Sequence, residues 1–298
     1  MHPSRTDPES PDRRSESPAD PARTALEPQR REPARVVCAI PARWGSTRLP
    51  GKPLLELAGK PMIQHVYERA GEATGVDRVV VLTDDERILD AVRGFGGEAE
   101  MTPVECPSGT DRIAHAARSW SEEAIVNLQG DEPLIDPRAV SAVAEHLREL
   151  PGDAMVTLAA PLAEELRSDP ARVKVVLDRR GYALYFSRAP IPHRRDAAPA
   201  NASDPTGREE VAPTLLHIGI YGYRRDTLLE LAALAPTPLE RSEALEQLRA
   251  LESGVRIRVL RSDHSAVGVD TAADVREAER LLRQRSRPAG AVPASVES

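Results

Sequence analysis

Residues 40–54 read IPARWGSTRLPGKPL and directly follow the apolar run RVVCA at 35–39. The chain therefore leaves an expected strand at 35–42 and enters a loop of small residues that carries three cations, Arg43, Arg48 and Lys52. A simple turn needs one glycine or proline rather than this density of charge. Backbone N–H groups of such a loop can bind phosphate oxygens, and cations can neutralise the phosphate charge. We interpret the segment as a phosphate-binding loop; the alternative is a solvated surface loop.

Strand and helix patterns alternate outward from this loop. We expect further strands at 77–84, 97–102, 124–128 and 154–162, and helices at 61–72, 85–96, 109–120 and 137 to about 150. Alternation of this kind, with continuous β-branched runs, predicts an α/β fold: a mostly parallel, Rossmann-like sheet with helices on both faces. Ligands of such sheets bind outside the carboxyl ends of the strands.

The pattern changes in the second half of the chain. Two strands joined by a turn at 179–181 are expected within 173–188, followed by a long polar loop at 196–213. A strand at 215–225, helices at 225–234 and 241–252, a strand at 255–263 and a closing helix at 271–284 complete the expectation. We interpret about 173–224 as an insertion that serves as a small dimerisation or sugar-binding arm.

Composition narrows the function classes. The chain has 298 residues, a formal net charge of −7, 40% hydrophobic residues and only 3% aromatic residues. Mild acidity argues against general nucleic-acid binding, and no apolar run approaches the roughly 18 residues of a membrane span. The Pro-, Ser- and charge-rich segments 1–34 and 285–298 are expected to be disordered tails, which leaves one domain at 35–284.

Two aspartates follow apolar stretches far apart in the chain. Asp131 lies in QGDEP, directly after the expected strand at 124–128, and Asp270 lies in GVDT, just before the closing helix. Hard carboxylate oxygens are the ligands that Mg²⁺ prefers. Asp131 could instead be a loop acid and Asp270 a helix cap, so a shared metal site requires the last helix to return to the sheet.

Several polar side chains in the second half suit a polyhydroxylated acidic ligand, and an arginine could bind its carboxylate through two hydrogen bonds. Singly they are weak signals, and His217 between apolar residues is more often structural. Of the three glutamates at 240, 243 and 246, we expect the first two to form a solvated helix face. The candidates are Arg188, His217, Tyr221, Glu246 and Gln247.

Taken together, these motifs resemble the 3-deoxy-manno-octulosonate (Kdo) cytidylyltransferase family. The resemblance covers about residues 36–282 and rests on an ordered set of motifs: IPARWGSTRLPGKPL, GKPMIQHV, SGTDR, VNLQGDEP, VKVVLDRRGYALYFSRAPIP, HIGIYGYR, LEQLR and GVDT. It implies a nucleotide-diphospho-sugar transferase fold, a homodimer and a bacterial cytoplasmic enzyme. It also implies the Mg²⁺-dependent reaction CTP + Kdo → CMP-Kdo + pyrophosphate, which activates Kdo for lipopolysaccharide synthesis.

The resemblance also implies roles for individual residues. Arg43 and Lys52 would bind the CTP phosphates, and Asp131 and Asp270 would ligate Mg²⁺. Ser108 and Gly109 would lie near the cytosine. The residues around Kdo would be Arg48, Gln129, Arg188, His217, Tyr221, Glu246 and Gln247.

Two other readings remain open. The first is a cytidylyltransferase of the same fold that activates 8-amino-Kdo or sialic acid. The second is a non-catalytic sugar-nucleotide sensor, which would not need a pair of metal-binding aspartates.

Overall fold

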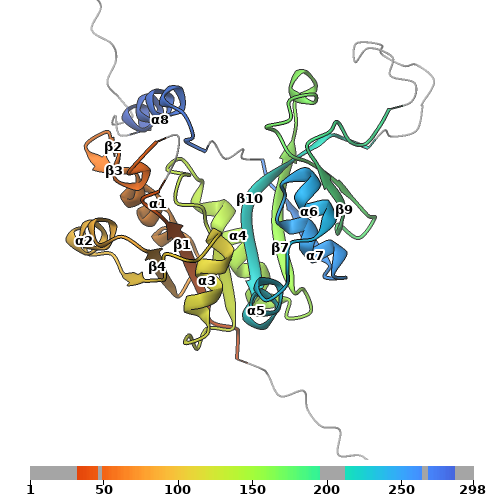
Figure 1. Cartoon of the computed structure of the whole chain (residues 1–298). Coiled ribbons are helices and arrows are strands. Elements are labelled where there is room, and N and C mark those ends of the chain that lie inside the picture. Colours follow the sequence, from red (N-terminus) through yellow and green to blue (C-terminus); the bar gives the residue numbers. More distant parts are fainter. Residues whose placement is uncertain (1–31, 46–48, 195–211, 264–267, 286–298) are drawn as a thin grey trace, which may run out of the picture. The chain divides into compact units, whose positions relative to one another are not determined.

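The computed structural model describes residues 32–45, 49–194, 212–263 and 268–285 (Figure 1). The described residues from Pro33 onward belong to one compact unit. The expectations for residues 1–31, for the greater part of the loop at 196–213 and for the tail after 285 lie outside the described residues.

The described residues contain a nine-stranded sheet. Its main path runs β11-β7-β10-β6-β1-β4-β5, with β8 pairing with β10 and β9 pairing with β8. The strands are β1 (Val36–Ala42), β4 (Arg78–Thr83), β5 (Ala99–Met101), β6 (Ala124–Asn127), β7 (Met155–Pro161), β8 (Lys174–Leu177), β9 (Ala183–Ser187), β10 (Leu215–Arg224) and β11 (Ile257–Arg261).

Most of the central pairings are parallel, as the alternating pattern predicts. β1 pairs in parallel with both β4 and β6, β4 with β5, and β7 with β11. β10 is inserted antiparallel between β6 and β7, with an irregularity between Ile218 and Tyr221. β8 and β9 form the antiparallel pair expected within 173–188.

Helices cover both faces of the sheet because its buried strands are apolar on both sides. In β1, Val36, Cys38 and Ile40 pack on one face, and Val37 and Ala39 pack on the other. The first face is covered by α1 (Met62–Gly71), α2 (Glu86–Gly94) and α4 (Pro137–Glu149), and the second by α3 (Gly109–Ala117), α5 (Arg225–Ala232) and α7 (Gln247–Glu252).

Two local features differ from the sequence-based expectation. The helix expected at 241–252 is divided into α6 (Pro238–Glu243) and α7, because Ala244 adopts a left-handed conformation with φ 50°. A short hairpin of β2 (Glu56–Leu57) and β3 (Lys60–Pro61), which we did not expect, turns through Ala58 and Gly59 at positive φ. Short 3₁₀ turns, η1 (Lys52–Leu54) and η2 (Glu164–Leu166), complete the list.

The closing helix α8 (Ala272–Arg285) packs beside this hairpin (Figure 1). Ala278 and Leu282 of α8 form a small apolar cluster with Leu57, Met62 and Val269, among others. Through this cluster α8, near the end of the described chain, packs beside the edge of the sheet where β1 ends.

Candidate active site

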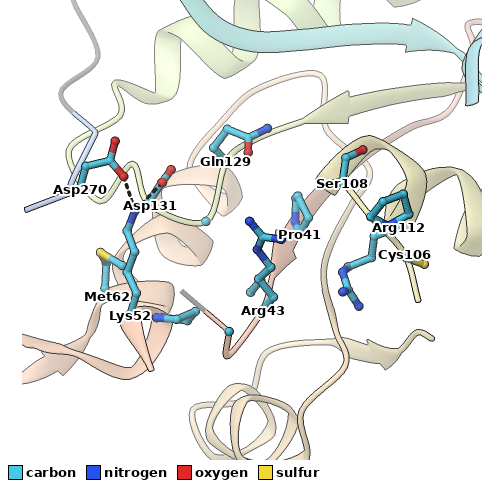
Figure 2. Close-up of a pocket in the computed structure, with 16 residues that line it drawn as sticks. Pro41, Arg43, Lys52, Met62, Cys106, Ser108, Arg112, Gln129, Asp131 and Asp270 are labelled. Atoms are coloured by element: carbon cyan, nitrogen blue, oxygen red, sulfur yellow. Dashed lines mark hydrogen bonds and ion pairs between the residues drawn. The ribbon is translucent and has the colours of Figure 1, made fainter. Parts of the chain in front are cut away.

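A cavity of about 500 Å³ lies beyond the carboxyl ends of β1 and β6 (Figure 2). This is the edge at which a parallel sheet binds ligands. Its walls come from the end of β1 with the loop that follows, the loop before α3, the loop after β6 and the segment before α8. The expected site residues among its lining are Arg43, Lys52, Ser108, Gly109, Gln129, Asp131 and Asp270.

Lys52 joins the two aspartates across this cavity (Figure 2). Its ammonium Nζ donates to Asp131 Oδ2 at 2.6 Å and to Asp270 Oδ1 at 3.0 Å. The lysine side chain is only 11% exposed, whereas the two carboxylates are 37% and 49% exposed toward the open space. Residues separated by 218 positions in the chain therefore form one charged cluster.

The backbone around the cluster explains this convergence. The amide of Val269 donates to the carbonyl of Asp131 at 2.9 Å, which ties the segment before α8 directly to the QGDEP loop. The amides of Asp270 and Thr271 donate to the carboxylate of Asp274, so the start of the helix is also fixed. Lys52 begins η1 after Gly51, whose φ of 69° favours glycine.

Two glycines let the walls of the cavity approach β1 closely. A Cβ on Gly130 would lie 2.9 Å from the carbonyl oxygen of Pro41, and a Cβ on Gly109 would lie 3.0 Å from the Pro41 side chain. Both contacts are tighter than ordinary side-chain packing allows. Glycine is therefore the residue that keeps the loops before α3 and after β6 against the end of β1.

Ser108 links the cavity to a second, smaller one. Its hydroxyl caps α3 by accepting from the amide of Asp111 at 3.1 Å, and its single proton is shared between Asp111 Oδ2 at 2.8 Å and Glu246 Oε1 at 3.1 Å. Glu246 also accepts from Thr110 Oγ1 at 3.0 Å. Burial raises the pKa of the Glu246 carboxyl, although these hydroxyl donors counteract part of the increase.

The smaller cavity, about 50 Å³, contains three of the expected sugar-binding residues: Tyr221, Glu246 and Gln247. Pockets for small ligands usually exceed roughly 300 Å³. This cavity alone therefore accommodates only part of an eight-carbon sugar, and the adjoining space near Ser108 would have to hold the remainder.

His217 and Tyr221 lie on β10 and their rings are in contact, tilted by 44° with centroids 5.3 Å apart. The His217 ring also packs edge-on against Phe186, and its Nε2 is 3.0 Å from Thr157 Oγ1. Burial lowers the pKa of His217 to about 3, so the imidazole is neutral at physiological pH. His217 therefore supplies no positive charge, and it lines neither of the two cavities.

Arg188 does not line either cavity among the described residues. Its guanidinium donates to the carbonyls of Pro170, Glu243 and Ala244, and its backbone amide donates to the Glu243 carboxylate. The expectation that Glu240 and Glu243 form a solvated helix face is wrong. Glu240 forms an ion pair with Arg249 at 2.6 Å, and Glu243 accepts hydrogen bonds from Ser187 and Arg188.

Arg48 lies outside the described residues, so its place is not described. The sequence interpretation named the SGTDR motif but missed the contribution of its Arg112, which lines the large cavity and is 2% exposed. Its guanidinium forms an ion pair with Asp84 at 2.6 Å. The SGTDR motif could have indicated this role. A buried arginine needs a carboxylate partner, and Asp84 directly follows β4, the strand that pairs with β1.

The chain matches the family model described as Cytidylyltransferase over residues 37–257. It is 51% identical to the 3-deoxy-manno-octulosonate cytidylyltransferase of Syntrophotalea carbinolica, over 83% of this chain and 98% of the relative. The enzyme of that name from Anaeromyxobacter dehalogenans is also 51% identical, over 83% of this chain and 97% of the relative.

A solved structure gives the same result. A CMP:2-keto-3-deoxy-manno-octonic acid synthetase in complex with CTP superposes with a TM-score of 0.77 at 43% identity, and the match covers 85% of this chain and all of the other. The fold, the site at the end of the parallel strands and these similarities agree. The chain belongs to the 3-deoxy-manno-octulosonate cytidylyltransferase family of nucleotidyltransferases.

Proposed function

We propose that this chain transfers CMP from CTP to Kdo with release of pyrophosphate, and that it uses Mg²⁺. The observation that carries the proposal is the cluster of Lys52, Asp131 and Asp270 in the large cavity, which Arg43 also lines. Relatives that share about half of their residues with this chain bear the name of that activity.

The donor set suits Mg²⁺. Asp131 and Asp270 supply hard oxygens that already share one cation, the Lys52 ammonium. The described residues contain no group of three or more His, Cys, Asp or Glu side chains arranged to hold a metal. Two carboxylates suit Mg²⁺, which usually binds one or two protein carboxylates and takes its other ligands from water and substrate phosphates. When bound, the ion would neutralise phosphate charge and lower the pKa of a coordinated hydroxyl.

The protein's own residues account for the other requirements of the reaction. Two anionic substrates repel one another, so Arg43 and Lys52 favour binding of the triphosphate by neutralising its charge. The anomeric 2-hydroxyl of Kdo attacks the α-phosphorus in line, and pyrophosphate leaves. Catalysis of such a transfer depends chiefly on positioning and charge neutralisation, and we assign no residue as a dedicated base.

The link through Ser108 supports a sugar site next to the nucleotide site. Glu246 accepts from Ser108 of the large cavity and itself lines the small one, so a ligand bound to Glu246 would lie beside a nucleotide in the large cavity. Tyr221, Gln247 and the neutral His217 add hydrogen-bonding groups for sugar hydroxyls. The roles of Arg48, Gln129 and Arg188 toward Kdo remain part of this proposal.

We also propose a homodimer that activates Kdo for lipopolysaccharide synthesis in the bacterial cytoplasm. The outer strand β9 supports the dimer, because its Leu184 is 62% exposed and thus available for an apolar contact. The described helices include none that is long and apolar enough to span a bilayer. Light scattering of the purified protein measures the dimer directly.

A substrate panel tests the reaction. Purified protein is incubated with CTP, Mg²⁺ and Kdo, 8-amino-Kdo or sialic acid, and pyrophosphate release is followed. We expect release with Kdo that stops when Mg²⁺ is chelated. Faster release with 8-amino-Kdo or sialic acid would reassign the sugar. Binding of CTP without turnover of any of these sugars would favour the sensor.

A further inference from the structure

The indole of Trp44, at the start of the loop that follows β1, contacts both the end of that loop and α2. A Cβ at residue 51 would lie 2.8 Å from the indole Cη2 and 3.1 Å from Cζ2. The guanidinium carbon of Arg87 is 3.3 Å from the ring centroid. The carbonyl of Trp44 also accepts from the amide of Gly51 at 3.2 Å.

The arginine in this stack is itself held in place. Arg87 Nε and Nη2 donate to the two carboxylate oxygens of Asp85 at 2.9 and 2.6 Å. Asp85 is the N-cap of α2 and accepts from the Arg87 amide at 3.0 Å. A bidentate pair fixes the plane of a guanidinium, and tryptophan is the aromatic side chain that attracts a cation most strongly.

We propose that Trp44 and Arg87 are positioning residues that hold together the two described ends of the phosphate-binding loop, residues 43–45 and 49–52. Arg43 precedes Trp44, and Lys52 follows Gly51, so the stack fixes the two cations that flank the loop relative to one another. This inference rests on the proposed function, since it assumes that these cations bind the triphosphate of CTP. It predicts an effect on nucleotide binding from residues that do not line the cavity.

The chain offers a matched control for Arg87. Arg138 binds the N-cap Asp136 of α4 through the same three donors, its amide at 2.8 Å, Nε at 3.1 Å and Nη2 at 2.8 Å. It lies at the start of a helix, as Arg87 does, but the described structure gives it no aromatic partner. Arg138→Gln therefore reports the effect of losing the arginine–aspartate pair alone.

The kinetic test compares Arg87→Gln, Trp44→Leu, Trp44→Phe and Arg138→Gln with the wild type. We expect Arg87→Gln to raise KM for CTP by roughly two- to five-fold, the range of one exposed cation–π contact. Trp44→Leu should raise it roughly tenfold or more, whereas Trp44→Phe should recover part of the loss. KM for Kdo and the melting temperature should change little, and Arg138→Gln should match the wild type.

Fluorescence gives a readout that does not need turnover. The chain has two tryptophans, so Trp120→Phe leaves Trp44 as the only indole. In that background Arg87→Gln should increase quenching of Trp44 by acrylamide and raise the Kd of CTP measured from its emission; Arg138→Gln should do neither. If Arg87→Gln behaved as Arg138→Gln does in both tests, the inference would be overturned.

The two proposals fail in different ways. If the wild type binds CTP but does not turn over Kdo, only the assignment of the sugar is lost, and the CTP titration still decides the role of Trp44. If the wild type binds no CTP at all, both the proposed function and this inference are wrong.

Discussion

At the scale of single residues, the central feature is one ammonium between two carboxylates. Lys52 is largely buried and donates to both Asp131 and Asp270, so the cluster carries a net negative charge in a cavity open to solvent. A cluster of this sign favours binding of a divalent cation together with phosphate oxygens. These three charged side chains are far apart in the chain but adjacent in space. Binding of a metal ion together with a nucleotide would require such a cluster.

Asp131→Asn should abolish Mg²⁺-dependent turnover without unfolding the protein. The change removes one anionic oxygen from the proposed metal site at nearly constant volume. Loss of several kcal/mol of charge stabilisation lowers kcat/KM by about 100-fold or more. Asp90→Asn, the same chemical change at an exposed position of α2, is the control and should match the wild type. A variant at position 131 with near-normal rate would show that this carboxylate does not bind the metal.

The sequence indicated which residues form this cluster, but not which of them contact one another. The motifs and the family resemblance named Lys52, Asp131 and Asp270 as candidate site residues, and the structure brings all three to one cavity. They did not predict that Lys52 pairs with both aspartates, because that requires the register of α8 against the β2–β3 hairpin. The packing roles of Glu240 and Glu243 were also missed, since their partners Arg249 and Ser187 are identified only by the tertiary structure.

At the scale of elements, β10 packs closely against α4 at Gly222. A Cβ on Gly222 would lie 2.5 Å from Val143 and 2.8 Å from Leu147, both on α4. Gly222→Ala should therefore destabilise the fold by about 1–3 kcal/mol through overpacking. Gly219→Ala on the same strand is the control, because its Cβ would meet nothing closer than 3.9 Å. Urea unfolding of both variants measures the difference, and equal midpoints would contradict the packing described here.

A second element-scale contact joins α4, β11 and the turn before β9. The buried Asp153 carboxylate accepts from His146 at 2.7 Å, Tyr182 at 2.6 Å and Arg258 at 3.1 Å. Burial raises the pKa of Asp153, but these three hydrogen bonds outweigh it, and the pKa is lowered. A lowered pKa stabilises the fold above the ordinary Asp value, about 4, and the contribution is lost as the pH falls below it.

Asp153→Asn should accordingly reduce the free energy of unfolding by about 3 kcal/mol at pH 7, the cost of breaking a buried ion pair. Tyr182→Phe removes only one of the donors and should cost about 1 kcal/mol. Urea unfolding between pH 7 and pH 3 provides the measurement. The gap between wild type and Asp153→Asn should stay constant down to about pH 4 and narrow below it; a gap independent of pH would refute the linkage.

Most elements were predictable because apolar periodicity and Gly or Pro positions mark them. The expected strands at 35–42 and 77–84 correspond to β1 and β4, and the helix at 137 to about 150 corresponds to α4. The break between α6 and α7 was not predictable, since alanine at residue 244 gives no local signal for positive φ. The two-residue strands of the β2–β3 hairpin were too short to show a period.

At the scale of the whole molecule, the compact unit begins at Pro33, and Arg35 already hydrogen-bonds to Glu123 and Ala124. Removal of residues 1–32 should therefore leave kcat/KM and the oligomeric state unchanged. Kinetics and light scattering of the truncated protein check this prediction. A severalfold loss of activity, or dissociation of a dimer that the full chain forms, would show that the extension takes part in the enzyme.

CTP and a divalent cation should bind together where Asp131, Asp270 and Lys52 meet. The most direct measurement is a crystal structure with CTP and Mn²⁺, which replaces Mg²⁺ at oxygen sites and is located by its anomalous scattering. We expect an anomalous peak within coordination distance of both carboxylates, with the triphosphate between that peak and Arg43. A nucleotide bound with its phosphates away from this cluster, or a Mn²⁺ peak that neither aspartate contacts, would contradict it.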